Sequence, residues 1–315
     1  MMKMKEKNFV SLVAYVRNDA DRVASFLQKV SAVLSENFLR YEIILVDDAS
    51  TDETVARIKE AVDSESGCMV QIIRMSYVQG VEMAMNAGVD LAIGDFVYEF
   101  DSIAFDYDRD LIMKVYHRSL EGYDIVSAVP QGNSRYTSRL FYWIYNNFSS
   151  NQYDLQTERF RILSRRAINR IRSLSKTIPY RKALYVNCGL VQDALKYIPG
   201  RETDSARFAE KEDDVFRWRM ALDALIIFTD VGYKLALFLS MSMIVGSVLI
   251  ALYVTFIFVI KQPVSGWASI MWLLSVGFAG TFALAAITIK YLDVIIGLVF
   301  KKKSYTFSAI EKITK

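Results

Sequence analysis

The chain has 315 residues, 53% of them hydrophobic, and a formal net charge of +3. This charge is too small to indicate nucleic-acid binding, so no nucleic-acid partner is expected. Two distant cysteines, Cys68 and Cys188, and one histidine, His117, exclude a cysteine or histidine metal motif, and we expect reduced thiols and a surface histidine.

The first hundred residues alternate strand-like and helix-like segments. The first apolar run, 9–16, is too short for a signal peptide and reads as a buried strand of a cytosolic domain. This order predicts an α/β fold with a Rossmann-like, mostly parallel sheet, helices on both faces and ligands beyond the carboxyl ends of the strands. The expected strands are 9–16, 42–46, 69–75 and 95–100, and the expected helices are 21–35, 52–62 and 81–93.

Acidic residues follow two of the expected strands. Asp47 and Asp48 come after the second strand, and Asp101 comes after the fourth. Such side chains can hydrogen-bond a base or ribose, or hold a divalent cation against a diphosphate. Each one alone is better explained as helix capping, but two acidic strand ends in one sheet favour a nucleotide-diphosphate site.

Two later segments carry charge. The segment 135–148 combines Arg135 and Arg139 with many aromatic residues. It reads either as a membrane-facing helix that receives a phosphate or as an amphipathic helix packed on the sheet, and guanidinium groups suit phosphate. The segment 201–214 is highly charged and reads as a loop.

The C-terminal third contains two long uncharged stretches, 235–260 and 266–289. As a helix, the first would extend about 39 Å, enough to cross a hydrocarbon core of roughly 30 Å, so we expect a transmembrane helical hairpin. The alternative is a buried helical pair. Basic residues before and after the stretches predict that both ends are cytoplasmic. The segment 215–229 reads as an interfacial helix or a cytosolic connector, and small residues in the second stretch permit a homo-oligomer.

The expected organisation is therefore a multi-pass protein of the cell inner (plasma) membrane. Its parts are a cytosolic domain (1–214), a juxtamembrane helix (215–231), the hairpin (232–300) and a basic cytosolic tail (301–315).

Several motifs together resemble glycosyltransferase family 2, specifically the polyprenyl-phosphate glycosyltransferases similar to dolichol-phosphate mannose synthase. The strongest is 46–54, Val-Asp-Asp-Ala-Ser-Thr-Asp-Glu-Thr, and 160–166 reads Phe-Arg-Ile-Leu-Ser-Arg-Arg. The resemblance implies a GT-A type domain that transfers a sugar from a nucleotide sugar, with a UDP-linked donor expected, to a polyprenyl phosphate lipid.

The resemblance also implies roles for individual residues. Asp101 would lie near the diphosphate and its Mg²⁺ or Mn²⁺. Nucleotide-sugar contacts would come from Tyr15, Arg17, Asp48 and Asp101, and lipid-phosphate contacts from Arg161 and Arg165. From the residue pattern itself we add Asp47 to the nucleotide-sugar contacts, and Arg135 and Arg139 to the lipid-phosphate contacts.

The pattern departs from the family at positions that carry chemistry. Ile103 replaces the second acid of Asp-x-Asp, for which Glu99 or Asp106 would have to substitute. Arg159 replaces the acid before Phe160, so the expected catalytic residues are Asp101 with Glu158 or Asp154 as displaced bases. Three hypotheses follow: an active transferase with altered metal dependence, in which Arg159 neutralises the diphosphate; a weak or inactive relative that acts as a binding or partner subunit; and a scaffold without a ligand.

Overall fold

The computed structural model describes most of the N-terminal two thirds of the chain, one long C-terminal helix and a short strand near the end. The predictions for Cys68, Arg135, Arg139 and the segment 201–231 lie outside the described residues. The described residues are 4–63, 69–132, 142–143, 145–147, 153–174, 180–200, 238–239, 242–243, 245–246, 249, 267–300 and 306–313.

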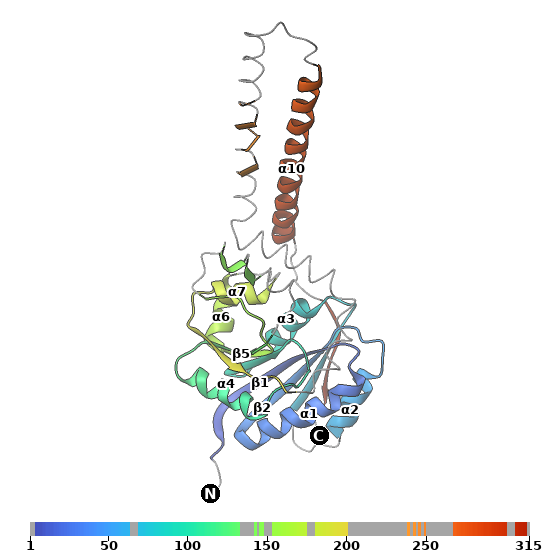
Figure 1. The fold of residues 1–315 in the computed structure, drawn as a ribbon. Coiled ribbons are helices and arrows are strands. Elements are labelled where there is room, and N and C mark those ends of the chain that lie inside the picture. The colour runs from blue at the N-terminus through green and yellow to red at the C-terminus, as the bar shows by residue number, and fades with distance from the viewer. Residues whose placement is uncertain are drawn as a thin grey trace. The chain divides into compact units, whose positions relative to one another are not determined.

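The strands among these residues form one sheet in the order β7-β5-β6-β4-β1-β2-β3-β8 (Figure 1). Most of its pairings are parallel, as the sequence predicted, but the sheet is mixed, because three of the seven pairings between these strands are antiparallel. Its centre, β4-β1-β2-β3, is parallel, but β6 and β8 pair antiparallel on the two sides of this centre. The strands are β1 (Glu6–Val16), β2 (Phe38–Asp47), β3 (Met69–Met75), β4 (Phe96–Phe100), β5 (Ile125–Pro130), β6 (Phe160–Ser164), β7 (Gln192–Tyr197) and β8 (Phe307–Ile313).

Helices cover both faces of the sheet, as expected for buried central strands. Neighbouring residues of one strand point to opposite faces: Leu12 belongs to the core under α1 and α4, and Val13 belongs to the core under α3 and α6. One face carries α1 (Ala20–Asn37), α2 (Thr54–Asp63) and α4 (Asp110–Leu120), and the other carries α3 (Val81–Leu91), α6 (Arg165–Leu174) and α7 (Arg181–Asn187) (Figure 1).

The predicted strands and helices of the first hundred residues are confirmed, with shifted ends. The largest shift is in β2, which begins at Phe38 rather than Glu42 because the exposed Leu39 and Arg40 hide the strand pattern. The surface position predicted for His117 is confirmed, and so is the buried thiol of Cys188.

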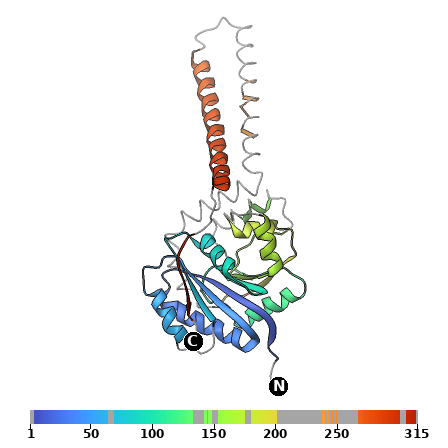
Figure 2. The same ribbon diagram turned by 180° about the vertical axis from the view of Figure 1, so that it is seen from behind.

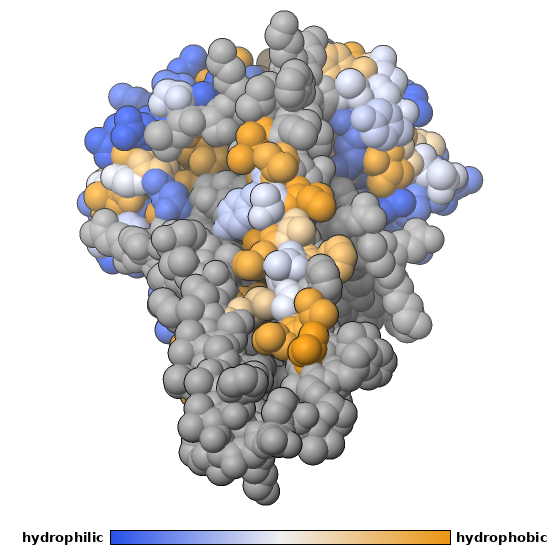
Figure 3. All heavy atoms as spheres, turned by 90° about the horizontal axis from the view of Figure 1, so that it is seen from above, coloured by the Kyte–Doolittle hydropathy of each residue, from blue (hydrophilic) through white to orange (hydrophobic). Residues whose placement is uncertain are grey.

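The long C-terminal helix, α10 (Trp267–Phe300), forms part of a second structural unit. It runs through Lys290 and Asp293 and ends eleven residues past Ile289, the last residue of the uncharged stretch. Within the described residues, no helix has both the length and the apolar character needed to cross a membrane. Hydrophobic surface is prominent in Figure 3, and α10 exposes the large apolar side chains of Ile270, Leu274, Phe282, Ile289, Leu292 and Ile295.

The last strand was not foreseen. Residues that the sequence assigned to a basic tail form β8, which pairs antiparallel with β3 at the edge of the sheet (Figure 2). Glu311 of β8 forms an ion pair with Lys59, with 2.5 Å between Glu311 Oε2 and Lys59 Nζ. The C-terminal residues thus return to the sheet that the N-terminal residues began.

Candidate active site

Three strand ends that carry predicted site residues meet at one edge of the sheet. Since β2 and β3 lie to one side of β1 and β4 lies to the other, the strand order changes direction between β1 and β4. Ligands of open α/β sheets bind at such a switch point, beyond the carboxyl ends of the strands. The register places Val16 beside Asp47 and Ala14 beside Phe100, so Asp48 follows beside Arg17 and Asp101 follows beside Tyr15.

The loops after β1 and β2 are joined by hydrogen bonds. The backbone N–H of Asn18 donates to Ser50 Oγ at 3.0 Å, and the N–H of Thr51 donates to Asn18 Oδ1 at 2.9 Å. The N–H of Asp19 donates to Thr54 Oγ1 at 2.7 Å. These bonds fix the end of β1 against the end of β2 before any ligand arrives.

Ala49 adopts a left-handed backbone conformation, with φ of +53°. An alanine side chain costs roughly 1 kcal/mol there, which glycine avoids. We therefore expect Ala49→Gly to raise the free energy of unfolding by about 1 kcal/mol, measured by urea denaturation. Asn18→Gly, at φ of +51°, is the control: asparagine tolerates this region and its side chain bonds Thr51, so that variant should gain nothing. An Ala49→Gly variant less stable than the parent would contradict this account.

The two acids at the end of β2 both face inward. Asp48 is fully buried and accepts hydrogen bonds from Tyr15 Oη at 3.0 Å and from the backbone N–H groups of Gln79 and Gly80 at 2.8 Å each. Asp47 accepts from the N–H of Ser50 at 3.3 Å, and burial raises its pKa. The carboxylates predicted to contact the nucleotide therefore hold the loops together, and Tyr15 is tied to Asp48.

Asp101, at the end of β4, is surrounded by cations. Its Oδ2 lies 2.8 Å from Arg161 Nη2 and 3.6 Å from Lys182 Nζ, and its Oδ1 lies 2.5 Å from Arg181 Nη2. Burial alone would raise the pKa of this carboxyl, but the charges of Arg161, Arg181 and Lys182 outweigh burial and hold the pKa far below its usual range. Asp101 is therefore ionised and already neutralised by protein groups.

More acids lie behind these cations. Glu99, fully buried on β4, lies 3.1 Å from both Arg161 Nη1 and Arg181 Nη1 and accepts a hydrogen bond from Tyr185 Oη at 2.7 Å. Glu82 pairs with Arg181 at 3.0 Å, and Glu158 pairs with Arg161 at 2.8 Å. We call this set the Asp101 cluster; its members are Glu82, Glu99, Asp101, Glu158, Arg161, Arg181 and Lys182.

The residues present do not fit the divalent metal that the sequence assigned to Asp101. Ile103 is buried in the hydrophobic core, and the suggested substitutes are engaged: Glu99 by the two arginines, and Asp106 by Arg159 and by Tyr197 Oη at 2.9 Å. Within the described part of the chain, no group of three acidic, histidine or cysteine residues could hold a metal ion. A metal at Asp101 would have one protein ligand and close cationic neighbours.

Other predicted site residues are also placed differently. Glu158 is committed to Arg161, Asp154 is exposed, and Arg159 pairs with Asp106 rather than lying at Asp101. Arg165 donates to the carbonyls of Ala92 and Gly94, before β4, at the opposite end of the strand from Asp101. Arg161 lies near the carboxyl end of β4, and Arg165 lies near the start of β4. The two arginines therefore do not form one phosphate site.

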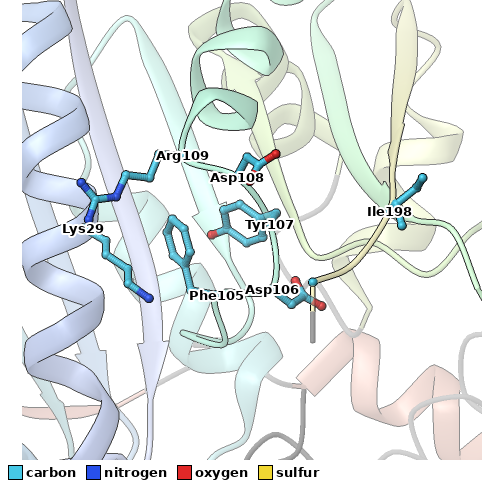
Figure 4. Close-up of a pocket in the computed structure, with 8 residues that line it drawn as sticks. Lys29, Phe105, Asp106, Tyr107, Asp108, Arg109 and Ile198 are labelled. Carbon is cyan, nitrogen blue, oxygen red and sulfur yellow. The ribbon is translucent and has the colours of Figure 1, made fainter. Parts of the chain in front are cut away.

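A separate cavity of about 350 Å³ lies beside the loop that follows β4 (Figure 4). Lys29 of α1 lies over the Phe105 ring, 5.0 Å from its centroid, and Asp106, Arg109 and Ile198 complete much of the wall. None of the predicted nucleotide-binding residues lines this cavity. We therefore place the candidate site at the switch point and not in this cavity.

Sequence reasoning missed two cations of the Asp101 cluster, Arg181 and Lys182. They begin the short helix α7, 80 residues after the carboxylate that they contact. Two adjacent basic residues form no motif and read as ordinary surface charge. Only a buried location distinguishes them, and Arg181 is fully buried.

The sequence is similar to those of known glycosyltransferases. The family model described as Glycosyl transferase family 2 matches residues 11–173, more than half of the chain. The chain is 28% identical over 276 residues to an uncharacterized glycosyltransferase of Synechocystis sp., with 83% of each chain covered. It is 24% identical over 291 residues to the bactoprenol glucosyl transferase of Shigella phage SfX, with 88% of this chain and 91% of the relative covered.

A solved structure also matches over most of the chain. It is a mannosyltransferase from Pyrobaculum calidifontis in complex with GDP-Man and Mn²⁺, which is 14% identical with a TM-score of 0.48. The match covers 91% of this chain and 88% of that one.

Proposed function

The chain belongs to glycosyl transferase family 2, and from this premise we propose that it transfers a sugar from a nucleotide-diphosphate sugar to a polyprenyl phosphate at the cytoplasmic face of the inner membrane. The observation that carries the proposal is the switch point between β1 and β4, where Arg17 and Asp101 follow the two strands. A UDP-linked donor is the form we expect.

The acceptor class is supported by chemistry and by a relative. The relative from Shigella phage SfX is named a bactoprenol glucosyl transferase. A phosphate monoester is already largely ionised near pH 7, so its oxygen can attack the sugar carbon without first losing a proton to a base. This acceptor therefore explains how a transferase can work while Glu158 is held by Arg161.

In the proposed reaction one carbon–oxygen bond forms and one breaks. The phosphate oxygen of the lipid bonds to the anomeric carbon of the sugar, and the bond from that carbon to the diphosphate oxygen breaks. The leaving nucleoside diphosphate takes the electron pair. Negative charge thus grows on the diphosphate, and the site must stabilise it.

The membrane attachment belongs to the same proposal. The sequence carries two uncharged stretches, 235–260 and 266–289, between the last described residue of β7 and the first of β8. Since β8 rejoins the sheet that contains β1, the chain must cross a membrane an even number of times between them. Two crossings keep the site and both termini in the cytoplasm, where a lipid phosphate can reach the site.

The test is sugar transfer by the purified full-length protein in detergent, with polyprenyl phosphate and a panel of radiolabelled UDP- and GDP-sugars. We expect a labelled, lipid-soluble product from one donor. Omitting the lipid phosphate, or replacing it with the free polyprenol, should abolish the product. Failure of every donor, with the protein folded and an active relative as control, would overturn the proposed reaction and favour a binding or partner subunit.

A further inference from the structure

The Asp101 cluster differs in exposure between its members. Arg161 and Arg181 are fully buried, whereas the side chains of Asp101 and Lys182 retain 18% and 14% of their exposure. The ammonium of Lys182 is also the most loosely held of the three cations, at 3.6 Å from Asp101. A ligand at the end of β4 would therefore meet Asp101 and Lys182, with two fixed guanidinium groups behind them.

This arrangement leaves Lys182 as the cation best placed to meet a diphosphate. The charges of Arg161 and Arg181 are also compensated by Glu82, Glu99 and Glu158, so the cluster holds four carboxylates against three cations. Among these carboxylates Lys182 contacts only Asp101, at 3.6 Å. Buried guanidinium groups stay charged at every physiological pH, and their fixed positions need no reorganisation when charge develops. A metal beside Asp101 would have to displace Arg161 or Arg181 from that carboxylate, and it would find Ile103 where a second ligand is needed.

We propose that Lys182, supported by Arg181, binds the diphosphate of the donor and neutralises the leaving group, so that donor binding does not depend on a divalent metal. This inference rests on the proposed function, because it assumes a nucleotide-diphosphate donor. An ammonium on a flexible stem can move the short distance from Asp101 to a phosphate oxygen, where a charge-assisted hydrogen bond forms. Asp101 keeps its contacts with Arg161 and Arg181 when Lys182 moves.

Calorimetric titration of the full-length protein with UDP and with GDP tests the metal requirement. Each titration is run in EDTA, in Mg²⁺ and in Mn²⁺, without any sugar or lipid. We expect the preferred nucleotide to bind in EDTA, with a Kd that either metal changes by less than about threefold. Binding strengthened more than about tenfold by metal would overturn the inference and leave the proposed function intact.

Substitution of Lys182 tests the contact itself. Lys182→Ala should weaken binding of the diphosphate about tenfold and leave binding of the free nucleoside unchanged. Lys182→Arg, which keeps the charge, should recover most of the affinity. The matched control is Lys196→Ala on β7, where the lysine is exposed and outside the cluster. Equal losses for nucleoside and diphosphate would overturn the role of Lys182, and no binding of any nucleotide under any condition would overturn the donor class together with this inference.

Discussion

Arg161→Met is expected to lower the free energy of unfolding by about 3–5 kcal/mol, because removing one member of a buried ion pair leaves its partners uncompensated. Arg161 is fully buried and contacts the carboxylates of Glu99, Asp101 and Glu158. Methionine fills much of the same volume and keeps the apolar contacts, so the loss reports on charge. Chemical denaturation of the full-length protein in detergent measures it.

Two further variants separate charge from packing. Arg166→Met makes the same chemical change at a guanidinium that is 68% exposed, although it pairs with Asp124, and should cost less than about 1 kcal/mol. Adding Glu99→Gln to Arg161→Met removes one of the buried negative charges that lose a partner, and should recover part of the loss. If Arg161→Met unfolds within 1 kcal/mol of the parent (about the size of an exposed pair), the buried network does not exist as described.

Deleting residues 306–315 is expected to have the second largest effect, a loss on the order of 3 kcal/mol from several backbone hydrogen bonds at about 0.5–1.5 kcal/mol each. The deletion removes the whole of β8 and leaves β3 as an open edge. It also removes a contact near the site. Thr306 and Gln79 exchange two hydrogen bonds, Nε2 to the Thr306 carbonyl at 2.5 Å and the Thr306 N–H to Oε1 at 3.0 Å.

The same residue links the strand to the site, since the backbone N–H of Gln79 donates to Asp48. We therefore expect the deletion to weaken nucleotide binding as well as stability, in parallel thermal unfolding and titration. Gln79→Ala keeps the β3–β8 ladder and should affect nucleotide binding more than stability. A truncated protein that matches the full chain in both measurements would show that β8 is not needed for either.

The first half of the fold could be predicted because its signals are local. Strand and helix periodicities give β1 to β4 and α1 to α3, and topology alone brings Asp48 and Asp101 to one edge of the sheet. The strands after Phe100 were missed, and so were the antiparallel pairings of β6 and β8. The short run of β8 follows three lysines and reads as a charged tail, although its place is set by pairing with β3 more than 230 residues away.

The chemistry of the site could be predicted only in part, for the same reason. The motif that contains Arg161 and Arg165 gives their residue types but not their partners, and the two side chains bind at opposite ends of β4. Ile103 was correctly identified as unable to bind a metal. The partners of Asp101 lie 60 and 80 positions later in the chain, at Arg161 and Arg181, and no local pattern encodes these contacts.

The position of β8 also sets the order in which the molecule can be completed. Synthesis proceeds from the N-terminus, so the sheet from β7 to β3 is made before the hydrophobic stretches and β8 is made last. Until then β3 presents an unpaired edge, which is a template for unwanted association. A nascent chain stalled before β8 would carry the loops after β1 and β2 without the strand that contacts Gln79. The hydrophobic stretches must therefore leave the ribosome before the sheet is complete.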